Sequence, residues 1–404
     1  MSQGHHHHHA ALEEIEVVPS DDFNHRDART SSVQGHRLLK RLGSGGYASV
    51  YLSERVNNGE LFAMKIMKKW KIIKYDAIDR TVDELKIHKQ LDSPFVIKLI
   101  ASFHTPTRVC MVLELAARRN LQEITDDRHA LIYDFKIKCW LAEMVLGLEY
   151  LHYKRVMHRD IKRENMLLTC QGHIKISDFG LSKEGMDKDT FTNTKCGTVP
   201  CMCPEMLMRI PYTRSADIWG LGIIALELIT GRSLFDSDNS QSIINKLTSM
   251  KSCNELEYPS NLTGVGLSFV RAILQFEPDR ISLERIRGHP YLEEVPWTSI
   301  LEFTPLDSSY KMPKKEYSHR PVILSKCPAL EGDDPFEGFD YLSDWRASYG
   351  RFWLQYPHFR RTTFYETFSK MLLSTPCNFV TRFTIFTTMC PLFVVFLNSF
   401  NRLF

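Results

Sequence analysis

Two short stretches decide the fold of this chain: HRDIKREN at residues 158–165 and DFG at residues 178–180. Transfer of a phosphoryl group asks a protein mainly for positioning and charge neutralisation, not for covalent chemistry. The two stretches supply groups of this kind, namely Asp160, Lys162, Asn165 and Asp178. Their order and spacing therefore predict a phosphoryl-transfer site.

Each of these side chains has a chemically distinct predicted role. Asp160 is the predicted base, which orients and deprotonates an attacking hydroxyl group. Asn165 and Asp178 are predicted ligands of magnesium, because this hard cation prefers oxygen donors. Lys162 lies two residues after Asp160 and is predicted to neutralise charge on the phosphoryl group in flight.

A glycine-rich stretch and a lysine lie upstream of the two loops. Gly43–Val50 reads GSGGYASV between two expected strands, where glycines let backbone N–H groups approach phosphate oxygens. Such hairpins are also common without any ligand. The segment FAMK ends at Lys65, and Glu84 in the expected helix 77–91 is a candidate ion-pair partner for it.

The order of patterns predicts an α+β fold with two lobes. Strand-like runs dominate a small β-rich N-lobe at 37–115, and the long apolar stretches 134–154 and 216–231 predict core helices of a larger α-helical C-lobe at 116–297. The helix 77–91 is expected to turn Ile78, Val82 and Leu85 to the core. Residues 1–36 are interpreted as a flexible lead.

Composition limits the partners. The net charge is +3, from 51 basic and 48 acidic residues, which gives no support to a nucleic-acid partner. The ten cysteines are scattered without a disulfide or metal-ligand pattern, so a reducing, cytoplasmic location is expected. The N-terminus has no apolar signal core, and its five consecutive histidines, a natural tract or a purification tag, are left out of the fold argument.

The motifs together resemble the eukaryotic protein kinase family over about residues 37–297. FAMKIMKKWKII at 62–73 and SPFVIKLIASF at 93–103 are similar to the AGC group, which contains cAMP-dependent kinase and protein kinase C. The resemblance implies ATP and Mg²⁺ as cofactors and protein hydroxyls as substrates. Lys162 beside Asp160 is typical of serine/threonine kinases.

The resemblance also assigns residues. Lys65, Glu84, Asp160 and Lys162 are implied to be catalytic, with Asn165 and Asp178 as metal ligands. In the family's pattern Leu113 is the gatekeeper, Asp217 braces the catalytic loop, and Glu205 pairs with Arg280. The implied ATP-binding residues are Leu42, Gly43, Ser44, Gly45, Gly46, Val50, Ala63, Lys65, Glu114, Leu115, Ala116 and Leu167.

Residues 298–346 resemble the C-terminal tail of AGC kinases. DPFEGFDYLS at 334–343 is similar to the group's hydrophobic motif, in which Phe336 and Phe339 would fill a pocket beside the Glu84 helix. Asp340 would supply permanent charge where relatives carry a regulated phosphate. The alternative is an ordinary aromatic loop.

The segment between the DFG stretch and Glu205 carries the expected regulatory site. Thr194 matches the threonine that an upstream kinase phosphorylates, with Arg159 as its expected partner and Thr192 as a substitute. Thr198 matches the threonine that contacts the catalytic aspartate. The departures from the family pattern are Cys201, Cys203, His88 and Arg163, the last in place of the usual proline.

Substrate preference follows less directly. Glu164 and Glu227 match acidic residues that read arginines upstream of the acceptor in basophilic relatives, so basic sites are expected. Residues 118–120, however, read Arg-Arg-Asn where the group usually has two glycines and a glutamate.

Two questions remain open from the sequence. Residues 347–404 match nothing in the family; within them, 383–401 lack charge but carry three threonines, two asparagines and Pro391, which favours a buried terminus over a membrane anchor. The alternative to an active kinase is a pseudokinase, a nucleotide-binding or scaffolding module, although the complete catalytic set argues against it.

Overall fold

The computed structural model describes residues 35–303, apart from 47, 117–118, 128–131 and 236–238, together with 324, 327, 329–330 and 333–343. The predictions for residues 1–34, for 347–404 and for the segment 383–401 lie outside this part of the chain. Within it, no helix combines the length and the apolar composition needed to cross a bilayer.

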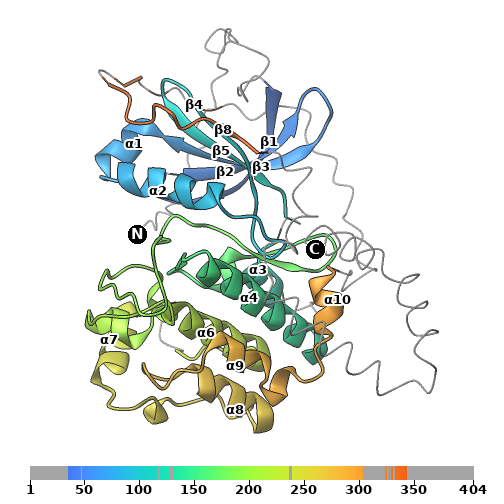
Figure 1. Ribbon diagram of the computed structural model, residues 1–404, viewed down its shortest axis with the longest axis vertical. Coiled ribbons are helices and arrows are strands. Elements are labelled where there is room, and N and C mark those ends of the chain that lie inside the picture. Colours follow the sequence, from blue (N-terminus) through green and yellow to red (C-terminus); the bar gives the residue numbers. More distant parts are fainter. Residues whose placement is uncertain are drawn as a thin grey trace, which may run out of the picture. The chain divides into compact units, whose positions relative to one another are not determined.

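The N-lobe is one antiparallel sheet in the order β1-β2-β3-β5-β4-β8 (Figure 1). Its strands are β1 (His36–Ser44), β2 (Ala48–Arg55), β3 (Leu61–Lys68), β4 (Leu99–His104), β5 (Arg108–Glu114) and β8 (Tyr341–Leu342). Along β3, Met64 and Ile66 are buried in a core under the sheet. Because side chains alternate along a strand, Lys65 lies on the opposite face. The sheet thereby turns this lysine toward the cleft.

Two helices accompany this sheet, α1 (Lys69–Lys74) and α2 (Ile78–Lys89). The sequence did not predict α1, which is only six residues long. The expected face of α2 was also partly wrong, because Val82 is 40% exposed. The buried face instead carries Glu84, Leu85 and His88. An apolar periodicity cannot find this face, because α2 turns polar groups toward the cleft.

The C-lobe is mainly helical and adds a short two-stranded sheet. Its elements are α3 (Leu121–Thr125), α4 (Asp134–Tyr153), α5 (Pro204–Met208), α6 (Ala216–Thr230), α7 (Ser240–Ser249), α8 (Gly264–Ile273), α9 (Leu283–Arg287), α10 (Trp297–Leu301), β6 (Met166–Leu168), β7 (Ile174–Ile176), and 3₁₀ turns at Arg163–Asn165, Val199–Cys201, Cys253–Glu255 and Pro290–Leu292. A β-rich lobe followed by a helical lobe confirms the predicted α+β fold.

Close packing fixes the catalytic loop on the C-lobe. A Cβ atom at Gly220 in α6 would lie 2.6 Å from the carbonyl oxygen of Ile161, which no real side chain tolerates. Glycine at this position lets α6 run directly beneath the loop that carries Asp160.

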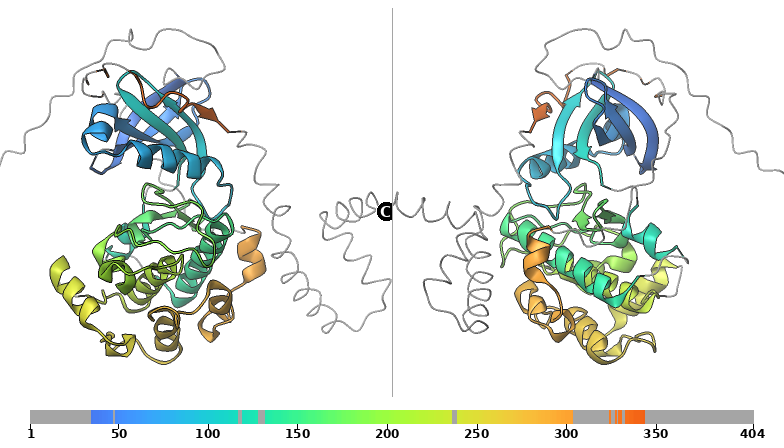
Figure 2. Two further views of the ribbon diagram at one scale, coloured as in Figure 1. Left: turned by 60° about the vertical axis from the view of Figure 1, so that its left-hand side comes forward. Right: turned by 90° about the vertical axis from the view of Figure 1, so that its right-hand side faces the viewer.

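The tail returns to the N-lobe. β8 adds to the edge of the sheet beside β4, with Ser102 opposite Tyr341, and Figure 2 shows it beside that strand. The added strand covers an edge that would otherwise expose unpaired backbone groups.

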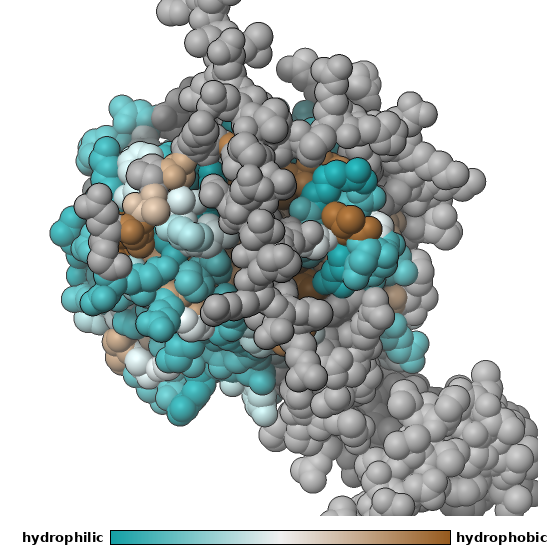
Figure 3. Space-filling model, turned by 90° about the horizontal axis from the view of Figure 1, so that it is seen from above, coloured by the Kyte–Doolittle hydropathy of each residue, from teal (hydrophilic) through white to brown (hydrophobic). Residues whose placement is uncertain are grey.

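Seen from the N-lobe side, the described surface is mostly hydrophilic, with small separate hydrophobic groups (Figure 3). Single exposed apolar side chains of this kind are normal for a folded domain and indicate no interface by themselves.

Candidate active site

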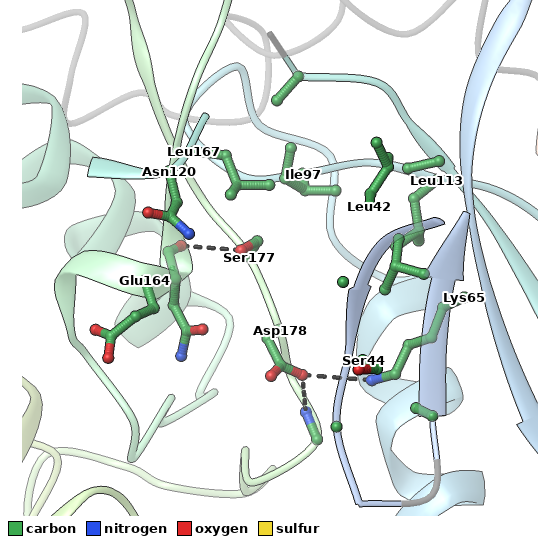
Figure 4. Close-up of a pocket in the computed structure, with 18 of the residues that line it drawn as sticks. Leu42, Ser44, Lys65, Ile97, Leu113, Asn120, Glu164, Leu167, Ser177 and Asp178 are labelled. Atoms are coloured by element: carbon green, nitrogen blue, oxygen red, sulfur yellow. Dashed lines mark hydrogen bonds and ion pairs between the residues drawn. The ribbon is translucent and has the colours of Figure 1, made fainter. Parts of the chain in front are cut away.

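A cleft of about 620 Å³ contains the predicted nucleotide site. Leu113 and Leu167 lie along one part of this cleft, and Lys65 and Asp178 face each other in another (Figure 4). The predicted residues that line it are Leu42, Gly43, Ser44, Gly45, Gly46, Val50, Ala63, Lys65, Glu84, Glu114, Leu115, Ala116, Asn165, Leu167 and Asp178. The cleft therefore brings together the whole ATP-binding set expected from the sequence.

A chain of charges crosses the cleft. Lys65 Nζ lies 2.6 Å from Glu84 Oε1 and 3.3 Å from Asp178 Oδ1. The positive charge of Lys65 lowers the pKa of Asp178 to about 2, so this carboxylate is ionised at neutral pH. Burial raises the pKa of Glu84, and the adjacent lysine opposes that shift. The expected Lys65–Glu84 ion pair is thus formed, and it extends to Asp178.

A second network surrounds Asp160, which is 8% exposed. Its Oδ2 lies 2.8 Å from Lys162 Nζ, and its Oδ1 accepts a hydrogen bond of 2.9 Å from the Thr198 hydroxyl. Lys162 Nζ also donates to Thr198 Oγ1 at 2.7 Å. These contacts fix the orientation of the carboxylate, and they place Thr198 where the sequence expected it.

The backbone of the catalytic loop is held in an unusual conformation. Arg159 has a φ of 67°, in the left-handed region that costs energy for residues other than glycine; Asp178 of the DFG stretch has a similar φ of 65°. Asp217 from α6 accepts hydrogen bonds of 2.9 and 2.8 Å from the backbone N–H groups of His158 and Arg159. These two bonds stabilise the loop conformation, as expected of Asp217.

The donor set fits a divalent metal. The Asn165 amide donates its N–H groups to the carbonyl oxygen and to Oδ2 of Asp160, at 2.8 and 3.1 Å, which leaves its own oxygen available as a ligand. Asp178 adds an ionised carboxylate. An amide oxygen and a carboxylate on one cleft suit Mg²⁺, which usually keeps water and phosphate oxygens as its other ligands.

An ion pair that the sequence did not indicate lies at the hinge, residues 114–116, which start at the end of β5 and lead to the C-lobe. Lys175 of β7 is 3% exposed, and its Nζ bonds both carboxylate oxygens of Glu114, at 2.8 and 2.9 Å. Glu114 ends β5, so this pair ties the hinge to the C-lobe. A lysine in a short C-lobe strand gives no sequence signal for a partner 61 residues away.

His88 lies deep in the same site. It is 3% exposed, its ring lies 4.9 Å from that of Phe179, and its Nε2 lies 2.7 Å from the carbonyl oxygen of Ile97. Burial lowers the pKa of His88 to about 4. The imidazole is therefore neutral in the folded protein at physiological pH.

The neutral imidazole predicts a pH-dependent stability. An unfolded histidine binds a proton near pH 6.5 and the folded one only near 4, so this contribution is complete above 6.5 and is lost as the pH falls toward 4. For His88→Leu we expect a free energy of unfolding that falls less between about pH 7.5 and 5, by roughly 2 kcal/mol. Urea unfolding at the two pH values measures this difference. An equal change in the free energy of unfolding for the wild type and His88→Leu would contradict the prediction.

The predicted activation threonines differ in environment. Thr194 is exposed, and its carbonyl oxygen accepts a hydrogen bond from Tyr212. The guanidinium of Arg159, its expected partner, donates to the carbonyl oxygens of Leu181 and Ser182, at 2.6 and 3.4 Å. Thr192 is buried and bonds Lys183 at 3.0 Å. The structure therefore leaves Thr194, and not Thr192, open to modification.

Of the two unexpected cysteines, Cys203 is buried and Cys201 is partly buried. Burial raises the pKa of both Cys201 and Cys203, which keeps them protonated and unreactive. The described residues contain no cluster of histidine, cysteine and acidic side chains that could hold a metal ion. After them, Glu205 forms the expected buried pair with Arg280, with both oxygens at 2.9 Å from Nη2.

The tail motif docks beside α2. Phe336 and Phe339 are 1% and 3% exposed and pack in one cluster with Ile72 and Leu85. Within the described part of the chain, the hydrogen bond of Asp340 is a long one, at 3.3 Å from the backbone N–H of His104.

The main charge contact of the tail is one that the sequence did not indicate. Asp334 pairs with Lys69, a fully buried side chain at the start of α1, and also lies 3.2 Å from His104 Nδ1. The carboxylate that anchors the motif therefore precedes the aromatic pair.

The cleft, its two charge networks and the two-lobed fold define a class of phosphoryl-transfer domain. The family model described as protein kinase domain matches residues 36–292, and the chain belongs to the protein kinase family. Its relatives support the AGC-type assignment made from the sequence.

Three curated relatives show how far the similarity reaches. Serine/threonine-protein kinase N2 of Danio rerio is 31% identical over 83% of this chain and 36% of its own length. Ribosomal protein S6 kinase beta of Caenorhabditis elegans is 30% identical over 76% of this chain and 59% of its own, and ribosomal protein S6 kinase alpha-2 of Homo sapiens is 30% identical over 82% and 48%. The chain thus spans less than two thirds of each relative. The zebrafish match covers 83% of this chain, which is more than residues 36–292 make up, so the similarity continues outside the family model.

Proposed function

We propose that this chain is an active serine/threonine kinase that transfers the γ-phosphate of ATP to protein hydroxyl groups. The observation that carries the proposal is that two networks meet at one cleft. Lys65, Glu84 and Asp178 line the cleft directly. Asn165 also lines it and is bonded to Asp160, which pairs with Lys162. A protein kinase domain implies ATP and a divalent metal.

The residues divide the reaction between them. The acceptor oxygen attacks the γ-phosphorus, the bond from that phosphorus to the bridging oxygen breaks, and ADP leaves. Asp160 orients the hydroxyl group and receives its proton, while Lys162 stabilises the transferring group. Lys65 binds phosphate oxygens, held in place by Glu84.

Magnesium is the metal we propose for this site. Asn165 and Asp178 would hold it, and it would neutralise charge on the phosphate oxygens. The low pKa of Asp178 supports this role, because the carboxylate needs no deprotonation before it binds a cation.

Serine and threonine are the proposed acceptors. Thr198 contacts both Asp160 and Lys162. Its side chain therefore lies beside the base to which an aliphatic acceptor hydroxyl group would bind. Thr194, exposed in the segment before it, is the proposed site of activating phosphorylation by another kinase.

The second candidate is a pseudokinase that binds nucleotide without turnover. The observations that favour it are the histidine packed on Phe179 and the direct bond between Lys162 and Asp160, which leaves the base paired before substrate arrives. Against it stand the six intact polar residues of the two networks.

Incubation with labelled ATP, magnesium and a serine/threonine/tyrosine peptide library separates the candidates. We expect label on serine and threonine, and loss of that label when EDTA removes the metal. A thermal shift on adding nucleotide without any labelled peptide would favour the pseudokinase. Label on tyrosine alone would contradict the assignment of acceptor.

A further inference from the structure

Arg163 lies in the sequence between Lys162 and Asn165. Its side chain pairs with carboxylates of the protein itself. Its Nε lies 2.7 Å from Glu227 Oε2, and its Nη1 lies 2.6 Å from the Thr125 hydroxyl and 3.5 Å from Asp126 Oδ1. The side chains of Arg163 and Glu227 are 17% and 12% exposed. This arginine is therefore anchored to α3 and α6 at once.

The two carboxylates of this region differ in their state. Glu227 is largely buried and pairs with Arg163. Glu164 is exposed and has no hydrogen-bond or ion-pair partner in the described part of the chain. Both are close enough to influence the Cys201 thiol electrostatically, and so is Asp160. The paired and the open carboxylate thus lie in one neighbourhood beside the acceptor site.

The pair has a direct consequence for substrate selection. A guanidinium group of a substrate gains most from a carboxylate that lacks a partner. At Glu227 it would meet a carboxylate already bonded to Arg163, and it would be repelled by that positive charge. Displacing Arg163 would strand a mostly buried cation, which is costly.

We propose that Arg163 is a specificity-determining residue, an internal counter-ion that closes Glu227 to basic substrate residues. The proposal rests on the proposed kinase function and names its substrate class: serine/threonine segments without a required arginine, with Glu164 as the open carboxylate of the two. It revises the expectation of basic substrates, because one of the two acidic residues behind that expectation is internally neutralised.

Matched peptides test the proposal. One peptide has a serine in a neutral context, and its partners carry a single arginine at each flanking position in turn. For the wild-type chain we expect kcat/KM ratios of arginine to neutral peptides within about threefold of one, or less than 1 kcal/mol. For Arg163→Ala we expect at least one position to rise about tenfold, the value of one charged hydrogen bond.

Two further variants identify the subsite. Arg163→Ala combined with Glu227→Gln should lose the acquired arginine preference, because the carboxylate that the first substitution exposes is then removed. Arg155→Ala removes an arginine from the exposed pair with Asp187, and its ratios should equal those of the wild type. A folded Arg163→Ala protein with wild-type ratios at every position would overturn the proposal, as would a wild-type chain with a strong arginine preference.

Peptide binding keeps this test separate from the proposed function. Fluorescence anisotropy with the same peptides requires no turnover and should show the same change of ratio. If no variant labels any peptide but Arg163→Ala gains affinity for the arginine peptides, the kinase proposal fails and the subsite proposal stands. If binding ratios do not change, the subsite proposal is wrong whatever the activity.

Discussion

Replacing Asp160 by asparagine is expected to lower kcat by about 10²–10⁴-fold. The change keeps the size of the side chain but removes the group that accepts the proton of the acceptor hydroxyl. It also leaves Lys162 without the negative charge that lies 2.8 Å from its Nζ. Nucleotide binding should persist, because Asp160 does not line the cleft. Single-turnover phosphate transfer and nucleotide titration measure the two effects separately.

A matched carboxylate makes this result specific. Asp187→Asn also removes one negative charge, from an exposed pair with Arg155, and should leave kcat near the wild-type value. If Asp160→Asn transferred phosphate as fast as Asp187→Asn, Asp160 would not be the base.

The double substitution Phe336→Ala and Phe339→Ala is expected to release the tail from the N-lobe. Truncating a buried phenylalanine costs about 3–5 kcal/mol. The loss of two such rings is expected to exceed the docking free energy that the other contacts of the short tail provide. The two rings pack against Leu85, the neighbour of Glu84 on α2. Without them the helix is less firmly held, so we expect kcat/KM to fall at least about tenfold. Peptide phosphorylation and the melting temperature record the loss.

One of the two residues between the rings provides the control. Glu337 is exposed, so Glu337→Ala should behave as the wild type. A synthetic peptide with residues 333–343, added in excess, should restore activity to the double variant. Full activity of the double variant without that peptide would show that docking of the tail does not position α2.

The local motifs predicted most of the cleft because their chemistry is carried by short segments. The residues of 158–165 and 178–180 come together with Lys65 and Glu84, and every residue expected at the nucleotide lines one cavity. The strand and helix patterns were strong enough to predict two lobes, since β3 alternates and α4 and α6 are long and apolar.

Contacts between distant segments could not be predicted in the same way. Lys69 and Asp334 are 265 residues apart, and nothing local to either residue marks the other. The hinge pair of Glu114 with Lys175 has the same character. The buried face of α2 was partly misjudged because the helix serves a polar site and an apolar core together. A rule based on hydrophobic spacing finds Ile78 and Leu85, which pack on the core, but misses Glu84 and His88.

Arg163 illustrates a third kind of limit. The sequence marks it as a departure from the family pattern, but only the structure assigns it a partner. Under our proposal, this charge beside opposite charges on two other elements alters the substrate preference, although it removes no catalytic group.

The central claim is that the cleft catalyses metal-dependent phosphate transfer through the protein's own carboxylates. Asp178→Ala tests it most directly, because this substitution removes a proposed metal ligand and one of the two carboxylates that pair with Lys65. We predict that the wild-type chain labels a serine peptide at a rate that rises with the magnesium concentration. Asp178→Ala, purified in parallel, should give no label above background. Equal labelling by the two proteins would show that the activity does not arise in this cleft.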